Sequence, residues 1–120
     1  MMGTSLTGDV SAFTNCTKLS TFNMYGSNMK LTGNISAFTN CTNLIGLVID
    51  NNDIYGDISA IKNCTKLTHL HIKRLYNVTG DISNINYIGY ALEASNTQLY
   101  GNVTVFANNT KIRRLYVNNP

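Results

Sequence analysis

The sequence predicts a solenoid of about five stacked repeats, with a parallel sheet of short strands on the concave face and 3₁₀ or extended segments on the convex face. The first observation is a phrase of glycine, Asp or Asn, a branched apolar residue and a hydroxyl residue. It occurs as Gly8-Asp9-Val10-Ser11, Gly33-Asn34-Ile35-Ser36, Gly56-Asp57-Ile58-Ser59, Gly80-Asp81-Ile82-Ser83 and Gly101-Asn102-Val103-Thr104. The glycines lie 25, 23, 24 and 21 residues apart. A period of about 20–30 residues is typical of solenoids whose repeats bury their apolar edges against each other.

The second observation is the spacing of apolar residues inside each repeat. In the second repeat they fall at Ile35, Phe38, Cys41, Leu44, Leu47 and Ile49. The steps of three fit a 3₁₀ or extended segment along the back, whereas the final step of two fits a short strand with alternating faces. The other repeats carry corresponding apolar pairs, so the pattern predicts strands near 22–24, 47–49, 70–72, 92–94 and 115–117.

The repeats follow one another without an obvious linker, so we expect a single domain over residues 1–120. The fourth repeat is two residues shorter on its back, and the fifth stops at its strand. No cap is visible at either end of the stack. Apolar side chains should therefore be exposed at the two ends, at Val10, Phe13, Leu19, Ile112, Leu115 and Val117.

Two further columns are interpreted as structural. Asn28, Asn52 and Asn77 should stack at the turn after each strand and satisfy backbone groups there, with Thr97 in the corresponding place of the fourth repeat. A cysteine occupies the same apolar position in three successive repeats. Cys16, Cys41 and Cys64 are therefore expected to be small buried hydrophobic residues with reduced thiols.

One segment carries a family resemblance. Leu47-Val-Ile49-Asp-Asn-Asn52-Asp-Ile54-Tyr-Gly56 resembles the leucine-rich repeat phrase L-x-L-x-x-N-x-L-x-G. The following Gly-Asp-Ile-Ser stands where plant-type repeats carry Gly-x-Ile-Pro, and is similar to repeats of gut-bacterial surface proteins and of some of their phages. The resemblance covers nearly the whole chain, and it implies a binding or assembly protein at a bacterial or phage surface.

Composition excludes several classes of partner. Only 12% of the residues are charged and the net charge is +3, too little for a nucleic-acid footprint because acids dilute the basic residues. We therefore expect no nucleic-acid partner. No stretch is long and apolar enough for membrane insertion, and the first residues do not resemble a secretory signal. Localisation stays open, with a virion or cell surface suspected from the resemblance.

The outward positions of the predicted strands vary between repeats, whereas the inward positions do not. The outward positions include Tyr and Arg, residue types favoured at binding sites. We therefore predict a partner-binding surface on the concave face, made by Tyr25, Asp50, His69, His71, Lys73, Glu93, Arg114 and Tyr116. Tyr55 and Tyr100 precede two of the repeated glycines and form a second candidate surface on a lateral edge.

Catalysis and metal binding are less well supported by these residues. His69, His71 and Glu93 should share a face, but no good further zinc ligand is evident. The candidate surface also lacks a nucleophile held against a base, and an open sheet excludes water poorly. We therefore expect no enzyme, no cofactor and no metal site.

Two functions remain open at this point. The chain is either a module that recognises a protein or glycan through the concave sheet or the lateral edge, or a structural subunit of a virion or other assembly. In the second case, another chain would stack on the uncapped ends of the solenoid.

Overall fold

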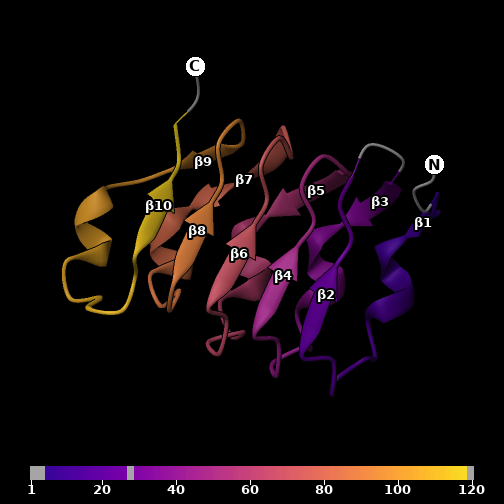
Figure 1. Ribbon diagram of the computed structural model, residues 1–120, viewed down its shortest axis with the longest axis horizontal. Coiled ribbons are helices and arrows are strands. Elements are labelled where there is room, and N and C mark those ends of the chain that lie inside the picture. The colour runs from indigo at the N-terminus through magenta and orange to yellow at the C-terminus, as the bar shows by residue number, and fades with distance from the viewer. Residues whose placement is uncertain (1–4, 27–28, 119–120) are drawn as a thin grey trace.

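The computed structural model describes residues 5–26 and 29–118 as a stack of repeats with two parallel sheets on opposite sides of one core (Figure 1). The predicted sheet is confirmed, and its strands begin and end one residue earlier than expected. They are β2 (Thr21–Asn23), β4 (Gly46–Val48), β6 (His69–His71), β8 (Ala91–Glu93) and β10 (Arg114–Tyr116), adjacent in that order. Their register aligns the first outward positions Thr21, Gly46, His69, Ala91 and Arg114.

The sequence did not predict the second sheet. Its strands are β1 (Thr7–Asp9), β3 (Lys30–Asn34), β5 (Asp53–Asp57), β7 (Asn77–Asp81) and β9 (Gln98–Tyr100), also adjacent in chain order. Three of the repeated glycines, Gly33, Gly56 and Gly80, lie inside these strands. Their φ angles of 112°, 118° and 118° explain why glycine recurs there, because other residues rarely adopt such angles.

The acid or amide after each repeated glycine caps a short 3₁₀ helix. The helices are η1 (Val10–Phe13), η2 (Ile35–Phe38), η3 (Ile58–Ile61), η4 (Ile82–Ile85) and η5 (Val103–Phe106). In each repeat the side-chain Oδ1 accepts a hydrogen bond from the backbone N–H two residues later, as Asp57 does from Ser59 at 2.8 Å. The same oxygen covers the next repeat, since a Cβ added to Gly80 would lie 2.6 Å from Asp57 Oδ1.

Apolar side chains from both sheets and from the helices fill the space between them. Leu47, Ile49, Ile58 and Ile61 are fully buried. Aromatic rings occupy the first two repeats, where Phe22 lies 4.7 Å from Phe13 and 5.1 Å from Phe38 between ring centroids. Within the described residues, no helix is long and apolar enough to cross a membrane.

The ends of the stack agree only in part with the expectation of exposed apolar residues. Leu115 is 36% exposed, whereas the equivalent Leu92 is fully buried. Phe13, Leu19, Ile112 and Val117 are half-buried. The expectation is wrong for Val10, which is fully buried. Val10 packs toward the second repeat, where its Cγ2 would lie 3.1 Å from a Cβ at Gly33.

Among the described asparagines that were expected to stack at the turns, only Asn52 is found in that role. Asn52 is buried, and it accepts from the Leu31 N–H at 2.9 Å and donates to the carbonyl of Met24 at 2.8 Å. Asn77 is instead exposed in β7. The extra residue of the third repeat follows the turn instead of preceding it, so Leu75 occupies the buried position. Asn28 lies outside the described residues.

Thr97 fills the corresponding position of the fourth repeat, where it is buried and donates to the carbonyl of Ala94 at 2.8 Å. Among the cysteines, Cys41 and Cys64 are buried free thiols as expected. Burial is the main cause that raises the pKa of Cys64 to about 11. Cys16 is exposed, contrary to expectation, because the first repeat has no described neighbour on its outer side.

The contact between caps and glycines predicts a difference between two equivalent substitutions. Gly80→Ala places a methyl group 2.6 Å from Asp57 Oδ1 and 2.9 Å from Ile58 Cγ2, whereas Gly8→Ala meets no atom within 4 Å. Both glycines have positive φ, 118° and 141°. We expect Gly80→Ala to lower the free energy of unfolding by about 1–3 kcal/mol more than Gly8→Ala, the usual cost of overpacking. Urea unfolding of both variants measures the difference, and equal losses would contradict an interlock between repeats.

Candidate functional site

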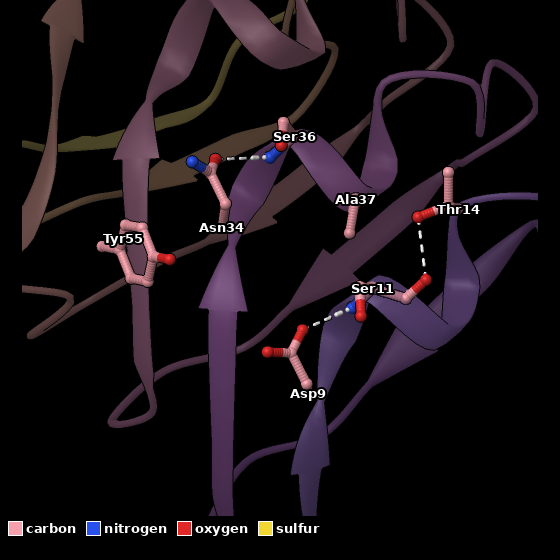
Figure 2. Close-up of a pocket in the computed structure, with 7 residues that line it drawn as sticks. All are labelled: Asp9, Ser11, Thr14, Asn34, Ser36, Ala37 and Tyr55. Carbon is pink, nitrogen blue, oxygen red and sulfur yellow. Dashed lines mark hydrogen bonds between the residues drawn. The ribbon is translucent and has the colours of Figure 1, made fainter.

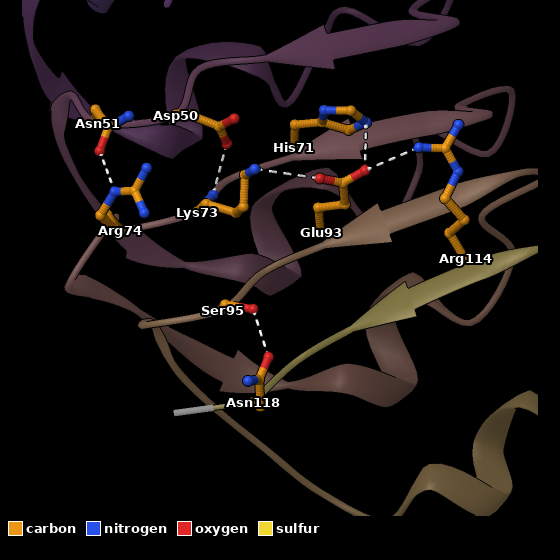
Figure 3. Close-up of polar contacts among 9 residues, drawn as sticks. All are labelled: Asp50, Asn51, His71, Lys73, Arg74, Glu93, Ser95, Arg114 and Asn118. Carbon is orange, nitrogen blue, oxygen red and sulfur yellow. Dashed lines mark hydrogen bonds and ion pairs between the residues drawn. The ribbon is translucent and has the colours of Figure 1, made fainter. Parts of the chain in front are cut away.

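The concave sheet and the turns that follow its strands bring charged side chains of three successive repeats together (Figure 3). β6 supplies His71, and Lys73 follows that strand by two residues. β8 supplies Glu93, which pairs with His71 in the strand register. β10 supplies Arg114, which pairs with Ala91. The fold thus gathers four of the predicted residues in one cluster.

Glu93 is the centre of this cluster and is only 7% exposed. Its Oε1 lies 3.4 Å from Lys73 Nζ, and its Oε2 lies 3.6 Å from both His71 Nε2 and Arg114 Nη1. A buried carboxylate without counter-charges is costly, so these neighbours stabilise it, with His71 contributing charge only when protonated. The sequence placed Glu93 on an outward column, and its burial arises from the long side chains on both sides.

Asp50 lies at the neighbouring turn and is also buried. Its Oδ1 accepts a hydrogen bond from the backbone N–H of Lys73 at 2.7 Å. Burial is the largest influence on this carboxyl and raises its pKa, while the Lys73 hydrogen bond and the charges of Lys73 and His71 oppose the rise. Asp50 therefore ties the turn after β4 to the turn after β6.

An aromatic and cationic row lies beside the cluster. The His69 ring stacks on Tyr90, with 4.9 Å between centroids and 29° between planes. The Arg114 guanidinium lies 5.5 Å from the centre of the Tyr90 ring, a distance typical of cation–π contacts. Tyr90 was missed from the sequence because it precedes its strand. The sequence feature that could have identified it is an aromatic residue directly before the first outward position of the shortened fourth repeat.

Tyr25 is exposed at the end of the same sheet. It lines a hollow of about 610 Å³ together with Lys30, Asp50, Asn51, Lys73 and Arg74. Arg74 and Asn51 both have φ of 63°, and the Arg74 Nε donates to Asn51 Oδ1. Three of the predicted residues therefore meet at this hollow. Tyr116 pairs with Glu93 in the strand register and is 52% exposed.

Tyr55 and Tyr100 lie on the second sheet and are separated by β7, so the fold does not bring them together. Tyr55 lines a hollow of about 330 Å³ in the convex region (Figure 2). Two polar side chains of this hollow, Asp9 and Asn34, cap helices by accepting from Ser11 and Ser36. These polar groups are thus used by the fold itself.

The arrangement offers fixed charges and exposed rings, which suit recognition. Within residues 5–26 and 29–118, no group of three or more His, Cys, Asp or Glu side chains is placed to hold a metal ion. His69 and His71 lie 6.1 Å apart between ring centroids. The Nδ1 of His69 is engaged by the Thr68 hydroxyl at 2.9 Å.

Solved structures show where this architecture is found elsewhere. An internalin of Listeria monocytogenes is 27% identical over 91% of this chain, with a TM-score of 0.65. Internalin C2 of the same bacterium is 19% identical over 92% of this chain, with a TM-score of 0.64. The leucine-rich repeat ectodomain of the Arabidopsis thaliana receptor kinase GASSHO1/SCHENGEN3, in complex with CASPARIAN STRIP INTEGRITY FACTOR 2, is 19% identical over 96%, with a TM-score of 0.64.

These neighbours are leucine-rich repeat proteins, which confirms the resemblance seen in the sequence. The chain spans about a third of the first internalin, about half of the second and about a sixth of the receptor ectodomain, at 32%, 47% and 17% of their lengths. The chain matches no protein-family model and no curated protein sequence.

The buried Asp50 gives a test of these electrostatics. Because the pKa of Asp50 is raised in the folded state, the ionised carboxylate reduces stability at neutral pH, and this loss disappears as pH falls through the folded-state pKa. Asp50→Asn keeps an oxygen that can accept from Lys73 but carries no charge. We expect this variant to be at least as stable as the wild type at pH 7, with a smaller difference at pH 4. Urea unfolding at both pH values measures this.

The exposed Asp53, the first residue of β5, provides the matched control, because Asp53→Asn changes the same charge at a solvated position. An Asp50→Asn protein that is clearly less stable than the wild type at pH 7 would show that the attraction of Lys73 and His71 outweighs burial.

Proposed function

Because the chain has the leucine-rich repeat fold, we propose that it is a non-enzymatic module that binds a protein partner through its concave sheet, without a cofactor. The observation that carries this proposal is the buried Glu93 with charged neighbours from two other repeats. Stacking does not require this cluster, since the equivalent positions of other repeats hold Asn23, Val48 and Tyr116. Its ion pairs hold the Lys73 and Arg114 side chains in defined positions facing solvent.

The exposed part of the cluster has the chemistry of an interface. The Arg114 side chain is 49% exposed and Tyr116 is 52% exposed. Arg and Tyr are the residue types that most often dominate binding energy when a partner covers them. Since Glu93 already neutralises part of the charge, burying Arg114 against a partner costs less than burying an isolated cation.

The class of partner is supported by one of the similar structures, a receptor ectodomain in complex with CASPARIAN STRIP INTEGRITY FACTOR 2. A protein is therefore favoured here over a glycan. The setting that we propose, a bacterial or phage surface, rests on the likeness of the Gly-Asp-Ile-Ser phrase alone. We treat residues 1–120 as one binding unit.

Photo-crosslinking tests the face and the class of partner together. A photoreactive amino acid at Asn23 samples the concave sheet, and the same residue at the exposed Lys62 samples the convex helices. In extracts of the source cells, we expect a protein adduct from the Asn23 position alone. Arg114→Gln combined with Tyr116→Ala should reduce that adduct about tenfold or more, because loss of two interface anchors costs more than about 1.4 kcal/mol.

Both altered side chains are about half exposed, so the double variant should fold, and circular dichroism checks this. Equal adducts from the two crosslinking positions, or an adduct that the double variant leaves unchanged, would overturn the concave-face proposal.

A second candidate function is assembly through the ends of the stack. The 36% exposure of Leu115, against full burial of Leu92, favours it. In that case, light scattering of the 1–120 chain should give a mass that rises with concentration above 13.2 kDa. Leu115→Lys should return the mass toward that of one chain, because a lysine at a sheet edge opposes pairing. A constant mass of one chain at all concentrations would rule this candidate out.

A further inference from the structure

Side chains at or directly before the first outward positions of the concave strands form a row with one gap. Arg114 lies over the Tyr90 ring, and Tyr90 stacks on His69. The next position in the register is Gly46, which has no side chain. A hollow of about 280 Å³ opens there, the Gly46 hollow, lined by Thr21, Asn23, Ile45, Gly46, Val48, Thr68 and His69.

The backbone does not need a glycine at this position. The φ angle of Gly46 is not positive, so other residues can adopt its backbone conformation. A Cβ added there would meet only Thr21 Cγ2, at 3.9 Å, which is an ordinary van der Waals contact. Glycine weakens a strand relative to residues with side chains, and in strands it often marks a place where a ligand approaches closely. Gly46 therefore lowers stability without serving the fold.

The walls of the hollow indicate what it accepts. None of its lining residues is Asp, Glu, Lys or Arg, and Ile45 presents an apolar side chain that is 50% exposed. β6 lies between β4 and β8, so His69 has Tyr90 on one side and the Gly46 hollow on the other. The Thr68 hydroxyl contacts His69 Nδ1 at 2.9 Å and so holds the imidazole ring in place.

We propose that the Gly46 hollow binds an aromatic side chain of the protein partner, which stacks on His69 and continues the row of Arg114, Tyr90 and His69. The inference rests on the proposed function and names the anchor that the concave face accepts. Aromatic rings pair favourably at centroid distances of about 4.5–7 Å, which the spacing of neighbouring strands provides. A nucleotide is disfavoured because it brings phosphate, and no Lys or Arg lines this hollow.

Blocked amino acids provide defined probes for a nuclear magnetic resonance titration of the full chain. N-acetyl-phenylalanine amide should give saturable shifts at the Gly46 amide and the His69 ring. It should bind about fivefold more tightly than N-acetyl-leucine amide, because an aromatic pair contributes about 1 kcal/mol beyond its buried area. Adenosine 5′-monophosphate should bind more weakly than the phenylalanine probe.

Filling the hollow should separate binding from stability. Gly46→Ala should weaken binding of the phenylalanine probe, and Gly46→Val should abolish it. Both variants should unfold at higher urea concentration than the wild type, because each replaces a strand glycine at a position where an added Cβ meets only Thr21 Cγ2, at 3.9 Å. Thr32→Val, on the exposed face of the second sheet, is the control for an added apolar group and should leave binding unchanged.

Three outcomes would overturn the assignment of the Gly46 hollow. The first is the absence of a saturable shift. The second is equal or tighter binding of adenosine 5′-monophosphate or of the leucine probe. The third is unchanged binding of the phenylalanine probe to Gly46→Val. The photo-crosslinking experiment distinguishes a failure of this assignment from a failure of the proposed function. If Gly46→Val keeps the full adduct while Arg114→Gln with Tyr116→Ala loses it, the concave face binds the partner without the hollow.

Discussion

The structure depends on one contact between repeats, in which the capping oxygen of one repeat covers the glycine of the next. Asp57 Oδ1 both closes the start of η3 and fills the space above Gly80. The residue pair Gly-Asp or Gly-Asn therefore sets the vertical spacing and the register of the second sheet. Once that register is fixed, the strands of the concave sheet align as well, since each repeat carries both strands.

The sequence predicted the concave sheet well because its inward residues recur at the same places in each repeat. Leu47, Leu70 and Leu92 are all fully buried and align with one another. The second sheet was harder to predict, since its strands carry Gly, Asp and Asn, which are depleted in strands on propensity alone. Backbone hydrogen bonds between repeats override that propensity, and they become visible only when the repeats are stacked.

The sequence could predict which residues of the candidate site point outward from the sheet. It could not predict how buried each of them is or which side chains it contacts. Register alone places His71 beside Glu93. The burial of Glu93 depends on how far Lys73 and Arg114 extend from their own strands, and the ring row depends on Tyr90, which lies outside the strands. The third repeat shows a related limit, because counting back from its glycine led to Asn77 while the buried turn position holds Leu75.

The position of Glu93 has a mechanical consequence. Its carboxylate forms ion pairs with side chains from the repeat before it and from the repeat after it. These ion pairs link three successive repeats of the solenoid. In a solenoid, a small rotation between neighbouring repeats sets the curvature of the whole. A partner that pulls on Arg114 therefore also acts on the angle between repeats. Under the proposed function, the same carboxylate would therefore contribute both to the stiffness of the concave face and to its affinity for a partner.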